Sequence, residues 1–183
     1  MRSYRPLMIA AGIVVVLTVI ILLARPRQKP MASEDHQVTA LPTPAPSRLV
    51  LFFPGDDGLL HREAREVFGL PASTPARARL VMEELLAGSA TGLAPAFPWP
   101  LTVEEAFADP HGNVFIDLSS PPNPTVAGTS TELLLLFSAI NSVAANCPGT
   151  ERVQILFGGR EVKTLGHLDL SRPLRPSLEL VAP

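Results

Sequence analysis

The residues of this chain most suited to chemistry lie near its C-terminus, in the segment Gly166-His167-Leu168-Asp169. Residues two apart on a strand point to the same face, so His167 and Asp169 could be the orienting half of a catalytic triad or two ligands of a metal ion. The same side chains could instead hydrogen-bond a closing loop to a sheet, which is the interpretation we favour. Catalysis would require that alanine at either position removes an activity while leaving the melting temperature nearly unchanged.

Two further residues could take part in a functional site. Asp117 ends a β-rich run and is followed by Ser119 and Ser120. A capping or turn role, in which its carboxylate accepts hydrogen bonds from backbone N–H groups, is favoured over a role as general base. Trp99 stands in a proline-rich loop, where it is either a packed anchor of that loop or part of a surface that binds a partner.

The sequence lacks the short motifs that mark common active sites. There is no G-x-S-x-G, H-E-x-x-H, C-x-x-C, P-loop or G-x-G-x-x-G. Cys147 is the only cysteine, and its helical spacing from Ile140 and Val143 predicts a buried apolar side chain. We therefore assign no catalytic residue, no metal ligand and no cofactor. The remaining histidines are most simply solvated: His36, His61 and His111.

The net charge of -2 conceals an uneven distribution. Residues 1–47 carry five basic and two acidic side chains, whereas residues 48–183 carry ten basic and fifteen acidic ones. Binding to nucleic acid needs a concentrated basic surface, so a mildly acidic domain argues against a nucleic-acid partner.

The N-terminal part predicts a membrane anchor and a tether. Residues 7–24 are eighteen uncharged residues, long enough to span a hydrocarbon core, and they follow a stub of residues 1–6. Leu22 and Ala24 before an Arg-Pro pair do not form an A-x-A cleavage site, so we expect an uncleaved single-pass anchor with the domain outside the cytoplasm. Residues 25–47 contain five prolines and few large apolar residues, which predicts a flexible tether or, alternatively, a proline-rich docking peptide.

The first half of the domain predicts a hairpin, a helix and a second hairpin. Strands at residues 48–54 and 59–68 flank a Gly-Asp-Asp-Gly turn, and the second strand should leave its arginines solvated. Thr74 and Pro75 then predict a helix start, and the apolar spacing continues to Gly88. Two strands within residues 101–119 meet around Asp-Pro-His-Gly.

The second half predicts a long helix and a last hairpin. Thr129 and Glu132 form a capping box before an apolar helix that ends at Pro148-Gly149. Strands on either side of Gly158-Gly159 complete an order of β-β-α-β-β-α-β-β. This order predicts an α+β domain over residues 48–176, with two helices on one face of a mainly antiparallel sheet, and a tail at residues 177–183.

Four segments of the sequence form an ordered pattern over residues 48–175: LVLFFPGDDGLL, ELLAG followed by GLAPAFPWPLTV, NVFIDLSS, and VQILFGGREVKTLGHLDLSRPL. In this order and spacing, they resemble the GerMN domain family of sporulation and spore germination proteins. The resemblance implies an extracytoplasmic α+β domain similar to a ring-building motif, no established enzymatic activity, and a role in envelope or cell-surface assembly. It also implies that Gly166, His167 and Asp169 belong to a structural signature that closes the sheet.

The sequence thus predicts a single-pass envelope protein whose domain acts as a scaffold. Its expected partners are the membrane together with envelope proteins or further copies of the chain. Two alternatives stay open: a small cell-wall hydrolase that uses His167, Asp169 and Asp117, and a module that binds peptidoglycan glycans through Trp99.

Overall fold

A computed structural model describes residues 45–119, 129–165 and 168–183 of the chain. These ranges belong to the second of two units into which the chain divides, residues 43–183. In the described ranges, no helix has the length and apolar character needed to cross a membrane. The predicted anchor at residues 7–24 lies outside them, and so does most of the predicted tether.

The domain begins with a β-hairpin, as predicted. Strand β1 (Pro46–Pro54) pairs antiparallel with β2 (Leu60–Phe68), and a turn closed by a bond from the Gly55 N–H to the Leu59 carbonyl joins them. Because β1 starts at Pro46, the last two residues assigned to the tether belong to the domain instead. Leu49, Leu51 and Phe53 alternate along β1 and enter the core.

Helix α2 (Thr74–Leu86) covers part of the core with the face that the periodicity predicts. Ala78, Val81, Met82 and Leu85 are all buried. The helix start differs by one residue from the prediction, because Ser73 is the N-cap and Thr74 is already helical. Proline is tolerated in the first turn, where the backbone N–H has no helical partner to lose.

The strand pairs are mainly antiparallel, as predicted, but in the described residues they form three separate sheets rather than one, and one pair is parallel. The largest sheet has the order β3-β4-β5-β6, made by β3 (Val103–Ala108), β4 (Asn113–Leu118), β5 (Arg152–Phe157) and β6 (Arg160–Glu161). Strands β4 and β5 are parallel, because α3 (Thr129–Asn146) crosses from the end of one strand to the start of the other. The expected strand after Gly159 is also divided, since β7 (Thr164–Leu165) leaves the sheet and pairs with β8 (Leu168–Asp169).

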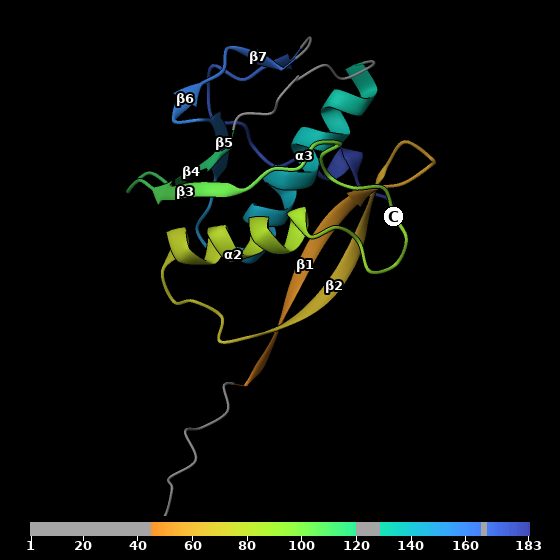
Figure 1. Cartoon of the computed structure of the whole chain (residues 1–183), viewed down its shortest axis with the longest axis horizontal. Helices are drawn as coiled ribbons and strands as arrows, with labels where there is room; N and C mark the ends of the chain where they lie inside the picture. The colour runs from red at the N-terminus through yellow and green to blue at the C-terminus, as the bar shows by residue number, and fades with distance from the viewer. Residues whose placement is uncertain (1–44, 120–128, 166–167) are drawn as a thin grey trace, which may run out of the picture. The chain divides into compact units, whose positions relative to one another are not determined.

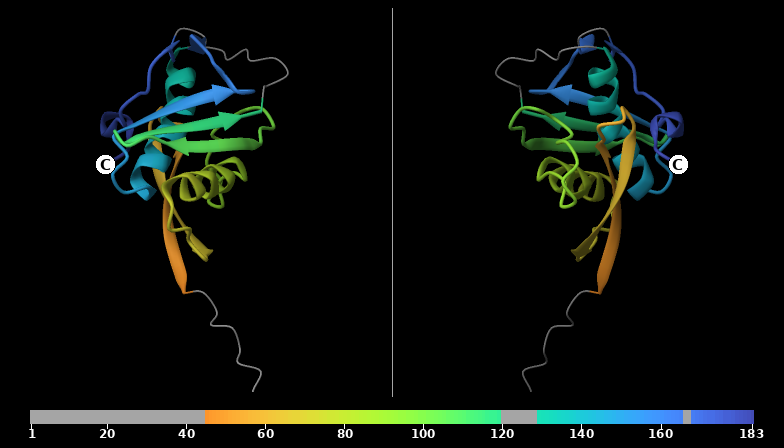
Figure 2. Two further views of the ribbon diagram at one scale, coloured as in Figure 1. Left: turned by 90° about the vertical axis from the view of Figure 1, so that its left-hand side faces the viewer. Right: turned by 90° about the vertical axis from the view of Figure 1, so that its right-hand side faces the viewer.

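Both helices pack on the four-stranded sheet, and α3 also packs on β1 (Figure 1). The hairpin of β1 and β2 runs across the direction of the sheet strands, as Figure 2 shows. One large core fills the space between these elements and draws side chains from β1, α2, α3, β4 and β5. The order α2-β3-β4-α3-β5 agrees with the predicted central module, whereas its similarity to a ring-building motif stays a prediction.

The C-terminal residues 177–183, which the sequence suggested to be a tail, pack against the hairpin. After the short 3-10 helix η1 (Leu178–Leu180), Val181 forms a parallel bridge with Leu60, and the Ala182 N–H donates to the Leu60 carbonyl. Leu180 and Val181 contact a small second core that contains Phe52 and Leu60.

Candidate functional site

The structure does not assemble the predicted chemical residues into one site. Gly166 and His167 lie outside the described residues. Asp169 is exposed at the end of β8 and accepts a hydrogen bond from the Ser171 N–H at 2.9 Å. Bonds from the Ser171 hydroxyl and N–H lower the pKa of Asp169, so its carboxylate is ionised and a weak base near neutral pH.

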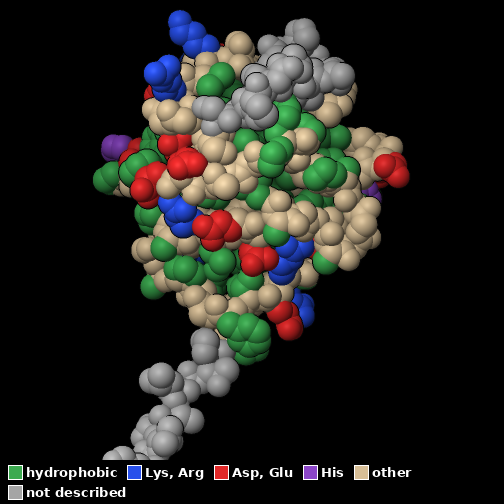
Figure 3. Space-filling model, viewed as in Figure 1, with side chains coloured by type: hydrophobic (Ala, Val, Ile, Leu, Met, Phe, Trp, Pro, Cys, Tyr) green, Lys and Arg blue, Asp and Glu red, His purple; other side chains and the backbone are tan. Residues whose placement is uncertain are grey.

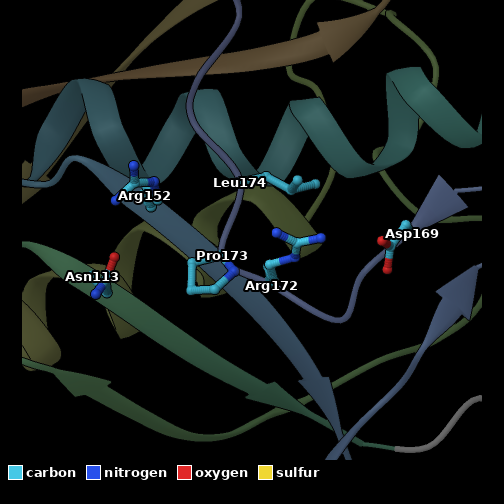
Figure 4. A pocket seen from close by; sticks show the side chains of 6 residues that line it. All are labelled: Asn113, Arg152, Asp169, Arg172, Pro173 and Leu174. Atoms are coloured by element: carbon cyan, nitrogen blue, oxygen red, sulfur yellow. The ribbon is translucent and has the colours of Figure 1, made fainter.

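Asp169 lines an open pocket of about 580 Å³ with residues from the starts of β4 and β5 and from the segment after β8. In Figure 4, Asn113 and Arg152 line the side opposite Asp169, with Arg172 and Pro173 between them. The described lining includes no serine or cysteine nucleophile. Within the described residues, no cluster of three or more His, Cys, Asp or Glu side chains could hold a metal ion.

Asp117 lies at the end of β4, where it makes the contact expected of a turn-capping carboxylate. Its Oδ1 accepts the Gly159 N–H at 2.8 Å, and Gly159 has a φ of +72° in the turn between β5 and β6. No hydrogen bond or ion pair joins Asp117 to Asp169 among the described residues. The two carboxylates therefore serve separate turns.

Three other residues considered in the sequence analysis make contacts that support the fold. Trp99 is half-buried and packs against the main core beside buried Phe97. Cys147 is buried, as predicted, and burial raises the pKa of its thiol to about 11 despite the opposing charge of Arg77. His61 is paired at 3.0 Å with the Asp57 carboxylate rather than simply solvated.

A polar stripe on α3, which the sequence analysis missed, covers the free edge of β1. Asn146 accepts the Val50 N–H at 2.9 Å and donates to the Val50 carbonyl at 2.8 Å. Ser142 accepts the Phe52 N–H at 2.9 Å, and Ser138 donates its hydroxyl to the Phe52 carbonyl. The signal was a four-residue spacing of polar side chains on an otherwise apolar helix.

From these contacts and the register of the hairpin, one can deduce which backbone groups of β2 face outward. The backbone groups of Val50 and Phe52 point to α3, so these residues form non-hydrogen-bonded pairs with Ala64 and Arg62 across the hairpin. The N–H and C=O groups of Arg62, Ala64, Glu66 and Phe68 consequently point away from β1. We call these four residues the β2 edge.

The β2 edge is open in the described part of the chain. The C-terminal segment covers the carbonyl of Leu60, and the outward backbone groups of the β2 edge have no hydrogen-bond partner among the described residues. In the right-hand view of Figure 2, β2 lies in front of β1 and faces the viewer. All four side chains of the edge are exposed, and Phe68 retains 63% of its accessible surface. An unpaired strand edge is a template for another strand.

A buried carboxylate holds β2 against the loop after α2. Glu63, only 4% exposed, accepts hydrogen bonds from the Arg65 guanidinium at 2.6 Å, from the Ser89 and Thr91 hydroxyls, and from the Ala90 and Thr91 N–H groups. We call this the Glu63 cluster: Glu63, Arg65, Ser89, Ala90 and Thr91. Burial alone would raise the pKa of Glu63, but these bonds outweigh it and lower the pKa to about 2.

Arg65 was expected to be solvated, and that expectation is wrong. Its side chain is 16% exposed and also donates to the carbonyls of Glu84 and Gly88, both at 2.7 Å. The Glu63 cluster therefore fixes the inner face of β2 while the β2 edge stays open.

The charged side chains at the surface are of both signs. On the face shown in Figure 3, acidic and basic side chains are mixed, and no large patch carries only positive charge. Some charged side chains of the described residues pair with each other, such as Arg79 with Glu83 and Glu105. The exclusion of a nucleic-acid partner stays a prediction.

Comparison with known proteins identifies the fold. A family model described as "Germane: Sporulation and spore germination" matches residues 50–163. The tandem GerMN domains of the Bacillus subtilis sporulation protein GerM superpose with a TM-score of 0.58 at 14% identity, over 81% of this chain and 51% of that one. This chain thus spans about half the length of the tandem. No curated protein matches the chain.

Two further solved structures share the fold. The first GerMN domain of the same B. subtilis protein has a TM-score of 0.51 at 17% identity, over 73% of this chain and 98% of that domain. A candidate lipoprotein from Clostridium perfringens has a TM-score of 0.51 at 20% identity, over 72% of this chain and 88% of that one. These matches confirm the resemblance to the GerMN family.

Proposed function

The chain belongs to the Germane family of sporulation and spore germination proteins, and we propose that its domain is a non-enzymatic assembly module that binds protein partners through the β2 edge. The observation that carries this proposal is the contrast between the two edges of one hairpin. Side chains of α3 bond the outward backbone groups of Val50 and Phe52 in β1, whereas the outward backbone groups of the β2 edge have no partner in the described residues. Strand addition to such an edge gives affinity through backbone hydrogen bonds.

The surroundings of the candidate chemical residues support a role other than catalysis. An enzyme needs its acid, base or nucleophile to converge on one pocket. Asp117 caps a turn, and Asp169 is an exposed weak base in a pocket whose described lining offers no serine or cysteine nucleophile. The half-buried packing of Trp99 likewise favours its role as a loop anchor over glycan stacking.

We place the module at the outer face of the cytoplasmic membrane. This placement rests on the uncharged residues 7–24 as a single-pass anchor, and the description of the C. perfringens relative as a candidate lipoprotein fits attachment to a membrane. A flexible tether of about twenty residues would give the domain a reach of about 25 Å. Such a reach allows the β2 edge to meet envelope proteins near the membrane surface.

Site-specific photo-crosslinking in cells tests the proposal with the full chain. A photoreactive amino acid at Glu66 should form defined protein adducts in the envelope, whereas the same group at Arg160, which is exposed on β6, should not. The substitution Ala64→Pro supplies the matched block. The Ala64 N–H points outward without a partner in the described residues, so proline removes a donor of the edge but no hydrogen bond of the fold.

Loss of the Glu66 adducts in the Ala64→Pro background, at unchanged protein level and protease resistance, would support docking at the edge. Equal adduct yields at Glu66 and Arg160, or adducts that persist after the Ala64→Pro substitution, would refute it.

A further inference from the structure

We propose that a second copy of this chain pairs antiparallel with the β2 edge, about a two-fold axis that passes beside Ala64. This inference rests on the proposed function and names one partner for the same surface. The inference rests on Arg62 and Glu66, which carry opposite charges two residues before and two residues after Ala64. When two copies of this segment run antiparallel with Ala64 opposite Ala64, each positive charge faces a negative one.

The backbone of the β2 edge fits this pairing. Arg62, Ala64 and Glu66 all direct both backbone groups outward, as the contacts of Val50 and Phe52 with α3 require. With Ala64 opposite its counterpart, each Arg62 lies opposite Glu66 of the second copy. These three residue pairs are all of the hydrogen-bonded type, so the new ladder contains about six backbone hydrogen bonds.

The side chains favour this register over its neighbours. Arg62 and Glu66 are exposed on the same face of β2, and cross-strand pairs of opposite charge are favourable. A register shifted by four residues in either direction places Arg62 against Arg62 or Glu66 against Glu66. A parallel arrangement in register also sets like charges side by side. The Ala64-centred register is the one that satisfies both charges of both copies.

The contacts that Arg62 and Glu66 already make within the chain leave both side chains able to form ion pairs with a second copy. Glu66 forms no ion pair among the described residues, and Arg62 uses one nitrogen to donate to the Ala182 carbonyl at 3.1 Å. Its guanidinium lies 5.8 Å from the centroid of the Phe52 ring, which holds the charge on the exposed face of the hairpin.

The ends of the ladder are defined as well. Leu60 cannot extend the pairing, because its carbonyl already accepts the Ala182 N–H. In the Ala64-centred register, the ladder therefore ends at the two pairs of Arg62 with Glu66, and Phe68 of each copy lies beyond these pairs. The pairing brings the exposed Phe68 side chain toward the C-terminal segment of the second copy, which contains the apolar residues Leu180 and Val181.

A ladder of this length gives a weak dimer in dilute solution. Anchoring both copies in one membrane raises their effective concentration, so the dimer should be trapped most readily in membranes. Disulfide trapping of the full chain suits this case, because Cys147, the only native cysteine, is 1% exposed.

The trapping experiment uses the Ala64→Cys chain in membranes, mild oxidation and a non-reducing gel. Facing residues of a hydrogen-bonded antiparallel pair have Cα atoms about 5.5 Å apart, within the range of about 4.4–6.8 Å that a disulfide accepts. A band at twice the 19.6 kDa of the chain is expected. Glu66→Cys is the register control, since two copies of this residue lie about 14 Å apart along the strands and should not react.

A mixture of Arg62→Cys and Glu66→Cys chains should again form a disulfide, because these positions face each other. In the Ala64→Cys background, Arg62→Glu or Glu66→Arg alone should lower the dimer yield about fivefold, and the two together should restore it. The substitution Arg160→Glu, on exposed β6, should leave the yield unchanged.

Equal disulfide yields from Ala64→Cys and Glu66→Cys would indicate random collision and overturn the inference. No dimer from Ala64→Cys would also overturn it. If photo-crosslinking at Glu66 then still captured a different protein in a manner that Ala64→Pro abolished, the proposed function would stand without self-pairing. Absence of both the dimer and the adducts would refute both.

Discussion

The substitution Glu63→Gln tests whether the Glu63 cluster stabilises the domain through the charge of its carboxylate. The amide keeps the shape of the side chain but replaces one acceptor oxygen by a donor, which then faces the donors of Ser89, Ala90 and Thr91. In the native protein these bonds lower the pKa of Glu63 from an ordinary value of 4.5 to about 2. At about 1.4 kcal/mol per pKa unit, the charge contributes about 3 kcal/mol to the free energy of unfolding.

The sign of the pH dependence follows from the direction of the shift. Because the folded pKa lies below the unfolded one, the stabilisation is complete above pH 4.5 and is lost as the pH falls toward 2. The Glu63→Gln domain should therefore melt roughly 10 °C below the native domain at pH 7. The gap between the two should narrow steadily below pH 4.5.

Fluorescence of Trp99, the only tryptophan, reports the unfolding of residues 45–183 because its ring packs against the core. Melting curves at pH 7, 5, 4 and 3 would be compared for the native domain, Glu63→Gln and the control Glu161→Gln, which replaces an exposed carboxylate. A gap of the same size at pH 7 and pH 3 would show that shape rather than charge matters, and would refute the argument.

Three further predictions concern α3, the cysteine that follows it and the N-terminal segment. Ser142→Ala leaves the buried Phe52 N–H without its acceptor, so the free energy of unfolding should fall by about 1–3 kcal/mol in urea titrations, whereas alanine at exposed Ser130 should change it little. Cys147 should resist thiol reagents at pH 8 until the domain is unfolded, since burial raises its pKa to about 11; rapid labelling of the native domain would contradict this. Val15→Arg, which costs about 2.5–3.5 kcal/mol in a membrane helix, should release the chain from membrane pellets, and a chain that stays membrane-bound would argue against the anchor.

The elements of the fold could be predicted because their signals are local. Each signal extends over only a few residues: the apolar, β-rich run of β1 before its turn, the helical spacing of apolar residues in α2, and the turn at Gly158-Gly159. The same reasoning missed the parallel pairing of β4 with β5. The sequence of each strand is compatible with either direction, and the direction is decided by the crossover of α3 between them.

The polar contacts that support the candidate surface were harder to predict from the sequence. Glu63 and Arg65 are typical of a solvated strand face when their neighbours in sequence alone are considered. Their partners in the loop after α2 lie about twenty to thirty residues away, and only the folded chain brings the donors of Ser89 and Thr91 around one carboxylate. A charged residue that alternates with others on a strand therefore does not reveal by itself whether it is buried.

The state of a strand edge is even less local, and it decides the function proposed for this domain. Val50 and Asn146, whose bond helps to close β1, are 96 positions apart. The backbone groups of Val50 and Phe52 bond to α3, so the residues opposite them in β2 turn their own backbone groups outward. Arg62, Ala64 and Glu66 therefore lie on the open edge because of contacts made by β1 and not by themselves. On a strand that is simply solvated, the opposite charges of Arg62 and Glu66 would indicate no binding partner. On an open edge, the same charges can favour one register, and for this reason we propose a second copy of the chain, running in the opposite direction, as the partner.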